Sequence, residues 1–454
     1  MSKTDQPVVV SNISWRDLCP WTIIFRSLNS ATSMTVLVMA LAALVLMPVG
    51  WLISDTVFLN DELRSDSVLA KLIDDNQKPY KRVFLATDPE ENSINLLGAR
   101  LSGPRMVFTQ IVEPFRQLFS LPTYSTALDG SDLGNDRWSV RAFFYLLGGC
   151  VWTIFLWSFA GVAICRTCLL KLTRNEPVGL DDAFEFALDK TLTVAGAVSA
   201  PLLAIGAMCL PAFVLGLIMG LDLGVLLVGL LWFVVLALGL VMALLLLGLM
   251  FGWPLMVASV ACEGQNSFDA MTRSYAYVMQ RPLNFVLYLL VSMVFGGFCW
   301  YVVANVADGA IGLGYWSTSF GTRLVGGTTE RLDIIRSIAP PMGLEDGNPI
   351  VVEPSSSLAG GQAMIRLWTW LGRTTAAAFI YGLFWCMMSA VYLLLRKDVD
   401  DTEMDEIYMV DERRTYELPP LKTDDKGIPQ VQKPEPVEES GSNESDNSSE
   451  PEES

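Results

Sequence analysis

The chain has 454 residues, of which 52% are hydrophobic and only 17% are charged. Soluble domains carry about 25% charged residues, so this composition excludes an ordinary soluble globular protein. The chain has no histidine, which removes Ser-His-Asp and Cys-His catalysis and His-ligated metal sites. The net charge of −17 is concentrated after residue 395, where 19 acidic residues stand against 7 basic ones. Such acidity argues against nucleic acid as a partner.

Several apolar runs are long enough to cross a membrane, since about 20 apolar residues span the hydrocarbon core. The longest, 191–260, is interrupted near its middle by the sequence GLDLG and is predicted to form two helices. We therefore expect an all-α integral membrane protein with six transmembrane helices. The predicted spans are 31–53, 142–164, 191–220, 224–252, 283–306 and 369–395.

Polar segments precede and separate these spans. Residues 1–30 are predicted to be a cytoplasmic N-terminus at the membrane interface, because tryptophans and arginines occur together there. The segments 54–141 and 308–365 are predicted to be extracytoplasmic. The first of them contains a strand-like run at 81–87 and a stretch at 107–119 that is apolar on one side.

Orientation follows from lysine and arginine near span ends in short loops. With six spans, every basic cluster lies on one face of the membrane, which places both termini in the cytoplasm and the protein in the inner membrane. The short loop on the opposite side, 220–224, contains Asp222 and no basic residue. Division of 191–260 into three helices would separate the basic clusters, so the charges disfavour it. The cytoplasmic residues are Arg16, Arg26, Arg166, Lys171, Arg174, Lys190, Arg273, Arg281, Arg396 and Lys397.

Two polar interludes on this face, 165–190 and 253–282, are predicted to form amphipathic interfacial helices. Asn266 is the expected N-cap of the second helix, and Pro282 is expected to end it and open the next. Because the order span, surface helix, span occurs twice, an architectural repeat is a hypothesis. The apolar sides comprise Leu180, Ala183, Phe184, Ala187 and Leu188 in the first helix, and Phe268, Met271, Tyr275 and Val278 in the second.

The candidate site is a polar constellation in the second interlude, formed by Glu263, Asp269, Arg273 and Arg281. Two interpretations stay open. The arginines can hold lipid phosphates at the headgroup layer. Alternatively, they can form structural ion pairs with Glu263, Asp269 or the acids of the first interlude and so fix the two surface helices together.

Other polar motifs give weaker signals. Cys165 and Cys168 form a CxxC at the end of a span, but no second CxxC or histidine completes a zinc site. We interpret them as small residues at the membrane boundary. The acidic run 398–406 lacks the glycine and glutamate of a calcium loop and is predicted to be a solvated helix extension. Residues 396–454 as a whole are predicted to be an acidic, largely disordered cytoplasmic tail that docks a soluble protein.

Four stretches carry a resemblance to a known group of proteins. The block GWPLMVASVACEGQNSFDAMTRSYAYVMQRP at 252–282 resembles uncharacterised multi-pass membrane proteins of planctomycete-type bacteria. The likeness extends to PWTIIFRSLNSA at 20–31, to AICRTCLLKLTRNEPVGLDDAFEFAL at 163–188 and to YLLLRKDVDDTEMDEIYMVDE at 392–412. Departures fall at Gln265-Asn266 and Cys168. The resemblance implies a multi-pass membrane fold and no particular activity.

A more distant similarity concerns the Glu-Gly pair at 263–264 followed by Ala-x-x-Arg-Ser at 270–274. This pattern is similar to the membrane regions of glycerophosphodiester phosphodiesterase anchors and related domains of unknown function. The catalytic barrel of those enzymes needs histidines, which this chain does not contain.

These observations predict an inner-membrane protein that is not an enzyme and binds no cofactor or metal. Its expected role is a scaffold, or a platform that binds membrane lipids or partner proteins. The alternative is a transporter or permease for a neutral or lipidic solute. The predicted spans contain no ionisable residue, counting the last from residue 375, whereas ion-coupled transporters usually need them. Pro201 and Pro211 keep a neutral-solute site open as a hypothesis.

Overall fold

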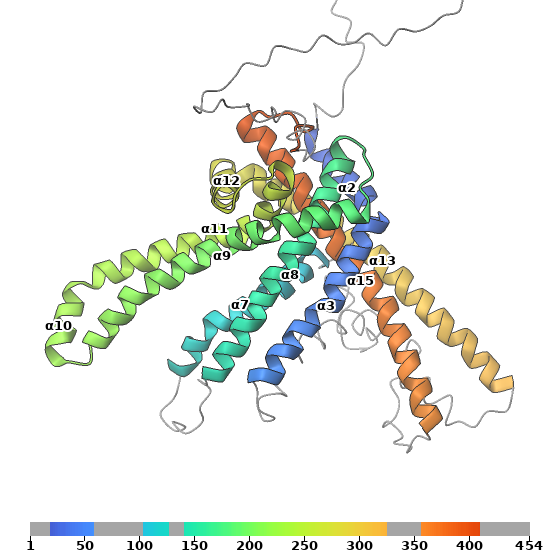
Figure 1. The fold of residues 1–454 in the computed structure, drawn as a ribbon, viewed down its shortest axis with the longest axis horizontal. Helices are drawn as coiled ribbons and strands as arrows, with labels where there is room; N and C mark the ends of the chain where they lie inside the picture. The colour runs from blue at the N-terminus through green and yellow to red at the C-terminus, as the bar shows by residue number, and fades with distance from the viewer. Residues whose placement is uncertain (1–18, 59–102, 127–139, 325–355, 409–454) are drawn as a thin grey trace, which may run out of the picture. The chain divides into compact units, whose positions relative to one another are not determined.

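The computed structural model describes residues 19–58, 103–126, 140–324 and 356–408, and within these ranges every regular element is a helix (Figure 1). The chain divides into two units, residues 1–407 and 408–454. Only Tyr408 of the second unit is described, so the architecture below is that of the first. The predicted strand-like run at 81–87 lies outside the described residues.

Six of the described helices are long and apolar enough to cross a membrane. This confirms a multi-pass, all-helical membrane protein. The six are α3 (Met34–Phe58), α8 (Val140–Thr173), α9 (Leu180–Ile218), α11 (Trp232–Glu263), α13 (Pro282–Leu324) and α15 (Ser356–Asp400). Shorter helices are the 3₁₀ turn η1 (Pro20–Thr22), α2 (Ile23–Ala31), α7 (Gly103–Thr126), α10 (Asp222–Leu230) and α12 (Ser267–Gln280).

The predicted separate helix at 165–190 is wrong. Helix α8 continues to Thr173 and ends beside Asn175, which adopts the left-handed conformation with φ 59°. Helix α9 then begins at Leu180 and continues without a break to Ile218. The leucine, alanine, lysine, arginine and glutamate residues of the interlude are good helix formers, so these stretches extend the two spans instead of forming a third element. Two aspartates in the first turn of α9, Asp181 and Asp182, complement the helix dipole there.

The stretch predicted as one helix at 224–252 is also divided differently. Its first part is α10, and the chain is interrupted at Leu231 before α11 begins. Helix α11 extends to Glu263, so only 267–280 of the predicted interfacial segment 253–282 is a separate helix, α12. Gly264, with φ 63°, ends α11 in the left-handed conformation that glycine adopts without strain.

Asn266 is the N-cap residue of α12, as predicted, but its side chain makes no capping hydrogen bond. Pro282 is the first residue of α13, where a proline removes no helical hydrogen bond. Helices also extend into the segments predicted to be polar. Helix α2 lies largely within residues 1–30, the predicted N-terminus at the membrane interface. Helix α13 extends to Leu324 and α15 begins at Ser356, so both enter the predicted segment 308–365.

Helix α15 is the central helix of the first unit, because it packs against α2, α3, α7, α8, α11 and α13. Its side chains from Ala376 to Leu395 are almost all buried. Helices α3 and α8 share the most extensive helix–helix contact, in which a tryptophan of each helix packs over a glycine of the other. A Cβ added at Gly50 would lie 2.1 Å from the Trp152 ring, and one added at Gly149 would lie 2.1 Å from the Trp51 ring. Only glycine permits this approach.

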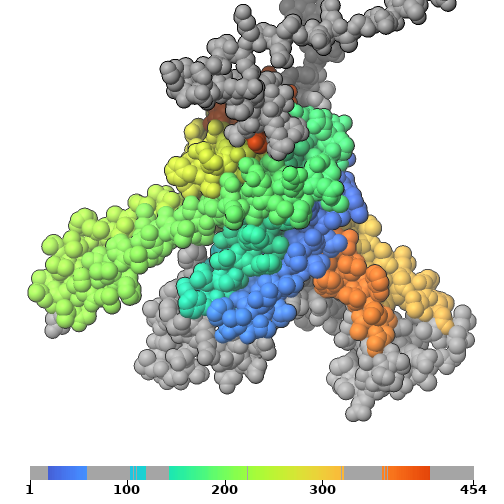
Figure 2. All heavy atoms as spheres, viewed as in Figure 1, coloured from blue at the N-terminus to red at the C-terminus, as the bar shows by residue number. Residues whose placement is uncertain are grey.

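The distal part of the hairpin formed by α9, α10 and α11, residues 203–247, buries little of its apolar surface (Figure 2). Large side chains along it are exposed, for example Leu203, Phe213 and Leu230 at 71%, 65% and 78%. In water such a surface would drive association. Next to hydrocarbon it is the expected surface of a membrane span.

Helix α7 is packed between the spans. Its first turn lies beside the middle of α13, where a Cβ at Gly103 would be 2.6 Å from Trp300 and one at Gly296 would be 2.6 Å from Pro104. Farther along, the Tyr381 hydroxyl of α15 donates a hydrogen bond to Gln110. The predicted extracytoplasmic segment 54–141 therefore contains a helix that contributes to the packing of α8, α13 and α15.

Candidate functional site

Several helix ends meet around α12. The C-terminal ends of α8, α11 and α15 and the N-terminal end of α9 lie at this end of the molecule, together with α2 (Figure 1). We call it the α12 end. All basic residues predicted to be cytoplasmic and described in the structure belong to these elements or to the turns beside them.

Glu263, the last residue of α11, is the centre of a polar cluster. Its carboxylate lies 2.5 Å from Nη1 of Arg273 on α12 and 3.1 Å from Nε of Arg396 on α15. The Tyr392 hydroxyl donates to the same carboxylate at 2.7 Å. Together, Glu263, Arg273, Tyr392 and Arg396 form what we call the Glu263 cluster. Gln265 also donates a hydrogen bond to Glu263.

The two arginines differ in exposure. The Arg396 side chain is only 9% exposed, whereas that of Arg273 is 47% exposed. Partial burial opposes the charge of Arg273, but Glu263, Tyr277 and Tyr392 together outweigh this effect and raise the pKa of the guanidinium. Arg396 additionally donates to the backbone carbonyl of Glu406 at 2.6 Å. The cluster therefore joins α11, α12 and the C-terminal end of α15.

A second buried arginine joins three helices at the same end. Arg166 of α8 donates to the carbonyl oxygen of Ala261 in the last turn of α11, at 3.2 Å. Its guanidinium carbon lies 4.7 Å from the centre of the Phe186 ring on α9. A cation is favourable at a helix C-terminus and over an aromatic face.

The acidic run 398–406 begins in the last turn of α15, and its first two aspartates make hydrogen bonds to other helices, which differs from the predicted solvated extension. Asp398 accepts hydrogen bonds from Asn284 at 2.9 Å and from Tyr288 at 2.8 Å. Asp400 accepts one from the Tyr277 hydroxyl of α12. Burial and this hydrogen bond raise the pKa of Tyr277. These aspartates are attached to α12 and α13.

Helix α12 is held from three directions. Besides the Tyr277 contact with α15, its Ser267 hydroxyl donates to the Thr193 carbonyl of α9 at 2.8 Å. The Tyr275 hydroxyl donates to the Leu245 carbonyl of α11 at 2.8 Å, and burial raises the pKa of Tyr275 to about 12. The packed side of α12 is Ala270, Ser274 and Tyr277. It is offset from the apolar side read from the sequence, and Phe268 is 67% exposed.

The structure therefore brings together two of the four residues of the predicted constellation, Glu263 and Arg273. Asp269 and Arg281 are exposed, and neither forms an ion pair or hydrogen bond through its side chain with the described part of the chain. Arg281 lies between the exposed side chains of Met279 and Leu283.

Cys165 and Cys168 are buried free thiols that pack against α15. Their sulfur atoms lie 3.8 Å from the Trp385 carbonyl oxygen and 3.6 Å from that of Cys386. Among the described residues, no three Cys, Asp or Glu side chains gather as metal ligands.

The chemistry available to the Glu263 carboxylate is limited by its neighbours. A general base needs a carboxylate within reach of a substrate proton. Here the oxygens already accept from two arginines, a tyrosine and a glutamine. This arrangement favours a structural role, in which Glu263 connects α11 to α12 and α15.

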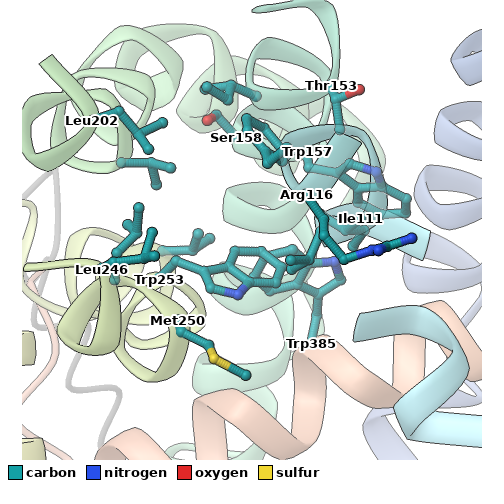
Figure 3. Close-up of a pocket in the computed structure, with 16 residues that line it drawn as sticks. Ile111, Arg116, Thr153, Trp157, Ser158, Leu202, Leu246, Met250, Trp253 and Trp385 are labelled. Carbon is teal, nitrogen blue, oxygen red and sulfur yellow. The ribbon is translucent and has the colours of Figure 1, made fainter. Parts of the chain in front are cut away.

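A second feature lies farther along the spans. An apolar cavity of about 550 Å³ lies between α7, α8, α9, α11 and α15 (Figure 3). Three tryptophans from different helices, Trp157, Trp253 and Trp385, contribute to its lining.

Comparison of the chain with protein-family models, with curated proteins and with solved structures gave no match. The fold and the two sites are therefore interpreted from their own geometry.

Sequence reasoning missed the roles of Arg396 and Tyr392 in the Glu263 cluster, and it missed the cavity. A signal existed for the first two, since a tyrosine and an arginine four residues apart on a helix share one side. A signal for the cavity was the position of Trp157 and Trp385 inside the predicted spans 142–164 and 369–395, because membrane tryptophans are enriched at the interfaces. Trp253 lies just after the predicted span 224–252 and gave no such signal.

Proposed function

We propose that the protein is a non-enzymatic, six-span protein of the inner membrane whose α12 end lies at the cytoplasmic surface and binds the headgroups of anionic lipids. Both termini would then be cytoplasmic. The accumulation of lysine and arginine at the α12 end supports this orientation.

The observation that carries the proposal is the contrast between the two sides of α12. One side is fixed to α9, α11 and α15 through Ser267, Tyr275 and Tyr277. The other side and the adjoining turn expose Phe268, Met279 and the guanidinium of Arg281. A fixed surface with apolar side chains beside a cation is suited to the headgroup layer, where apolar groups enter the membrane and arginine contacts phosphate.

The structure changes which arginine we assign to lipid. Arg273 is engaged by Glu263, so we assign lipid phosphate to Arg281. A basic residue near an anionic surface contributes about 1 kcal/mol, or about five-fold in affinity. In nanodiscs of mixed phosphatidylcholine and phosphatidylglycerol, Arg281→Gln should reduce retention of phosphatidylglycerol, counted by native mass spectrometry, by about that factor.

Lys190→Gln is the matched control, because the Lys190 ammonium already pairs with Asp189 at 3.0 Å and its side chain is 19% exposed. It should leave phosphatidylglycerol retention unchanged. Equal retention by wild type and Arg281→Gln would refute the assignment of Arg281. Recruitment of a soluble partner by the acidic tail remains a proposal from the charge of residues 396–454.

A second candidate function, a permease for a lipidic solute, is favoured by the apolar cavity between the spans. Its test is the movement of a fluorescent lipid between leaflets of proteoliposomes. A saturable rate above that of protein-free vesicles would favour the permease over the platform.

A further inference from the structure

The cavity is bounded by helices that cross the membrane and by α7. Leu202 of α9 and Leu246 of α11 lie on one side of it, and Trp157 of α8 and Ile111 of α7 lie on another (Figure 3). Its volume of about 550 Å³ falls within the range of about 300–1,000 Å³ typical of small-molecule sites.

The side chains that line the cavity present mainly carbon atoms to a bound molecule. The indole nitrogens of Trp157, Trp253 and Trp385 are themselves buried and without a hydrogen-bond partner within the described chain. What these rings expose to the cavity is therefore carbon. The Thr153 hydroxyl already donates to the Gly149 carbonyl at 2.7 Å, and Ser158 adds one further hydroxyl.

An apolar lining of this kind favours apolar ligands over polar ones. A sugar or an amino acid would lose its hydrogen bonds to water on entry and recover few of them, which costs several kcal/mol per polar group. Water is disfavoured for the same reason, and apolar cavities of this kind stay dry or take up apolar molecules. The abundant apolar molecule around membrane-spanning helices is the hydrocarbon chain of a lipid.

One charged residue, Arg116 of α7, also lines the cavity. Its side chain is 65% exposed, and it forms an ion pair with Glu113 at 2.5 Å. The Arg116 guanidinium is thus neutralised by a carboxylate, and the rest of the cavity lining is apolar apart from two hydroxyls.

We infer that this cavity binds an acyl chain of a glycerophospholipid, which it holds between α8, α9 and α11. The site is separate from the surface around Arg281, and it does not depend on the headgroup platform. A lipid held here is a component of the fold if it is bound permanently and a cargo if it exchanges.

The test uses a phospholipid that carries a photoreactive diazirine near the end of one acyl chain, with the full-length protein reconstituted in nanodiscs. After illumination, mass spectrometry should locate the label on cavity residues, including Leu202, Leu246 and Met250. Leu202→Trp fills the cavity and should lower labelling of α8 and α11 about ten-fold.

Leu203→Trp is the matched control, because it places the same ring on the adjacent residue, which is 71% exposed on the outer side of α9. It should leave the labelling unchanged. If Leu202→Trp fails to yield a monodisperse protein, Met250→Trp fills the same space from α11, with Leu247→Trp as its control.

The inference is overturned by labelling spread evenly over the outward leucines, or by cavity labelling that persists in a folded Leu202→Trp or Met250→Trp protein. A diazirine in the headgroup should leave the cavity residues of α8 and α11 unlabelled. Labelling of those residues by the headgroup probe would overturn the assignment of the acyl chain to the cavity. Neither result alters the phosphatidylglycerol retention expected of Arg281→Gln.

Discussion

Substitution of Glu263 by glutamine should strongly destabilise the protein. The change keeps the size of the side chain and an acceptor for Tyr392, but it removes the negative charge that compensates Arg396. That arginine is 9% exposed and Glu263 is 12% exposed. Loss of one partner from a buried ion pair costs about 3–5 kcal/mol. Because Tyr392 keeps an acceptor and the Glu406 carbonyl still binds Arg396, we expect the lower end, about 3 kcal/mol.

The assay is thermal unfolding of the purified protein in one detergent, followed by tryptophan fluorescence. A loss of about 3 kcal/mol should lower the unfolding midpoint by about 3 °C, because an unfolding entropy of about 2.1 cal/mol/K per residue amounts to about 1 kcal/mol/K in a chain of 454 residues. Arg273→Gln removes the other, half-exposed partner of Glu263 and should lower the midpoint by less than about 1 °C, since exposed pairs contribute about 0–1 kcal/mol.

A double variant separates a charge effect from a packing effect. When Glu263→Gln and Arg396→Met are combined, no unpaired buried charge remains, so the combined loss should be smaller than the sum of the single losses. The reasoning is refuted if Glu263→Gln is as stable as wild type, or if Arg273→Gln is equally damaging.

Three further predictions concern the α12 end. Gly248→Ala places a methyl group 1.6 Å from the Tyr275 ring and should lower the free energy of unfolding by about 1–3 kcal/mol. The control is Gly239→Ala on the same helix, whose methyl group meets nothing within 4 Å and should not destabilise the protein. A further Tyr275→Ala substitution should relieve part of the loss caused by Gly248→Ala. The raised pKa of Tyr277 predicts a contribution to stability that is fully present below about pH 10, where tyrosine ionises in the unfolded chain, and is lost as the pH rises toward the pKa of the folded protein. Thermal unfolding of Tyr277→Phe should therefore depend less on pH above 10 than that of wild type, and parallel curves would contradict this. Reporter fusions should read periplasmic after residue 220 and cytoplasmic after residue 265; any other pair of readings would reject the proposed topology.

The number and approximate positions of the spans could be predicted from the sequence because each run is nearly free of charges. Their ends could not. The polar stretch from Leu180 to Lys190 has the composition of a surface helix, but nothing in it terminates a helix before the apolar residues begin. The structure accordingly continues α9 from Leu180 through Thr191. The glycine after Glu263 ended α11 at a position that a hydropathy pattern does not specify.

The candidate site was predictable only in part, for a different reason. Glu263 and Arg273 are ten residues apart, on two consecutive helices, so their pairing is nearly local. Tyr392 follows Glu263 by 129 residues, and its position depends on how α15 packs against α11. The cavity depends on five helices at once. A single sequence shows which residues each helix contains but not which helices are neighbours.

The position of α7 has a consequence for the order of assembly. The helix precedes α8 in the chain, but it packs against α13 and α15, and Gln110 meets Tyr381, which is 271 residues later. Proteins are synthesised from the N-terminus, and early segments fold before late ones exist. Helix α7 therefore has to wait, incompletely packed, until the last span has entered the membrane. Its docking is a late event in biogenesis, and a chain that stops before α15 leaves this helix without one of its partners.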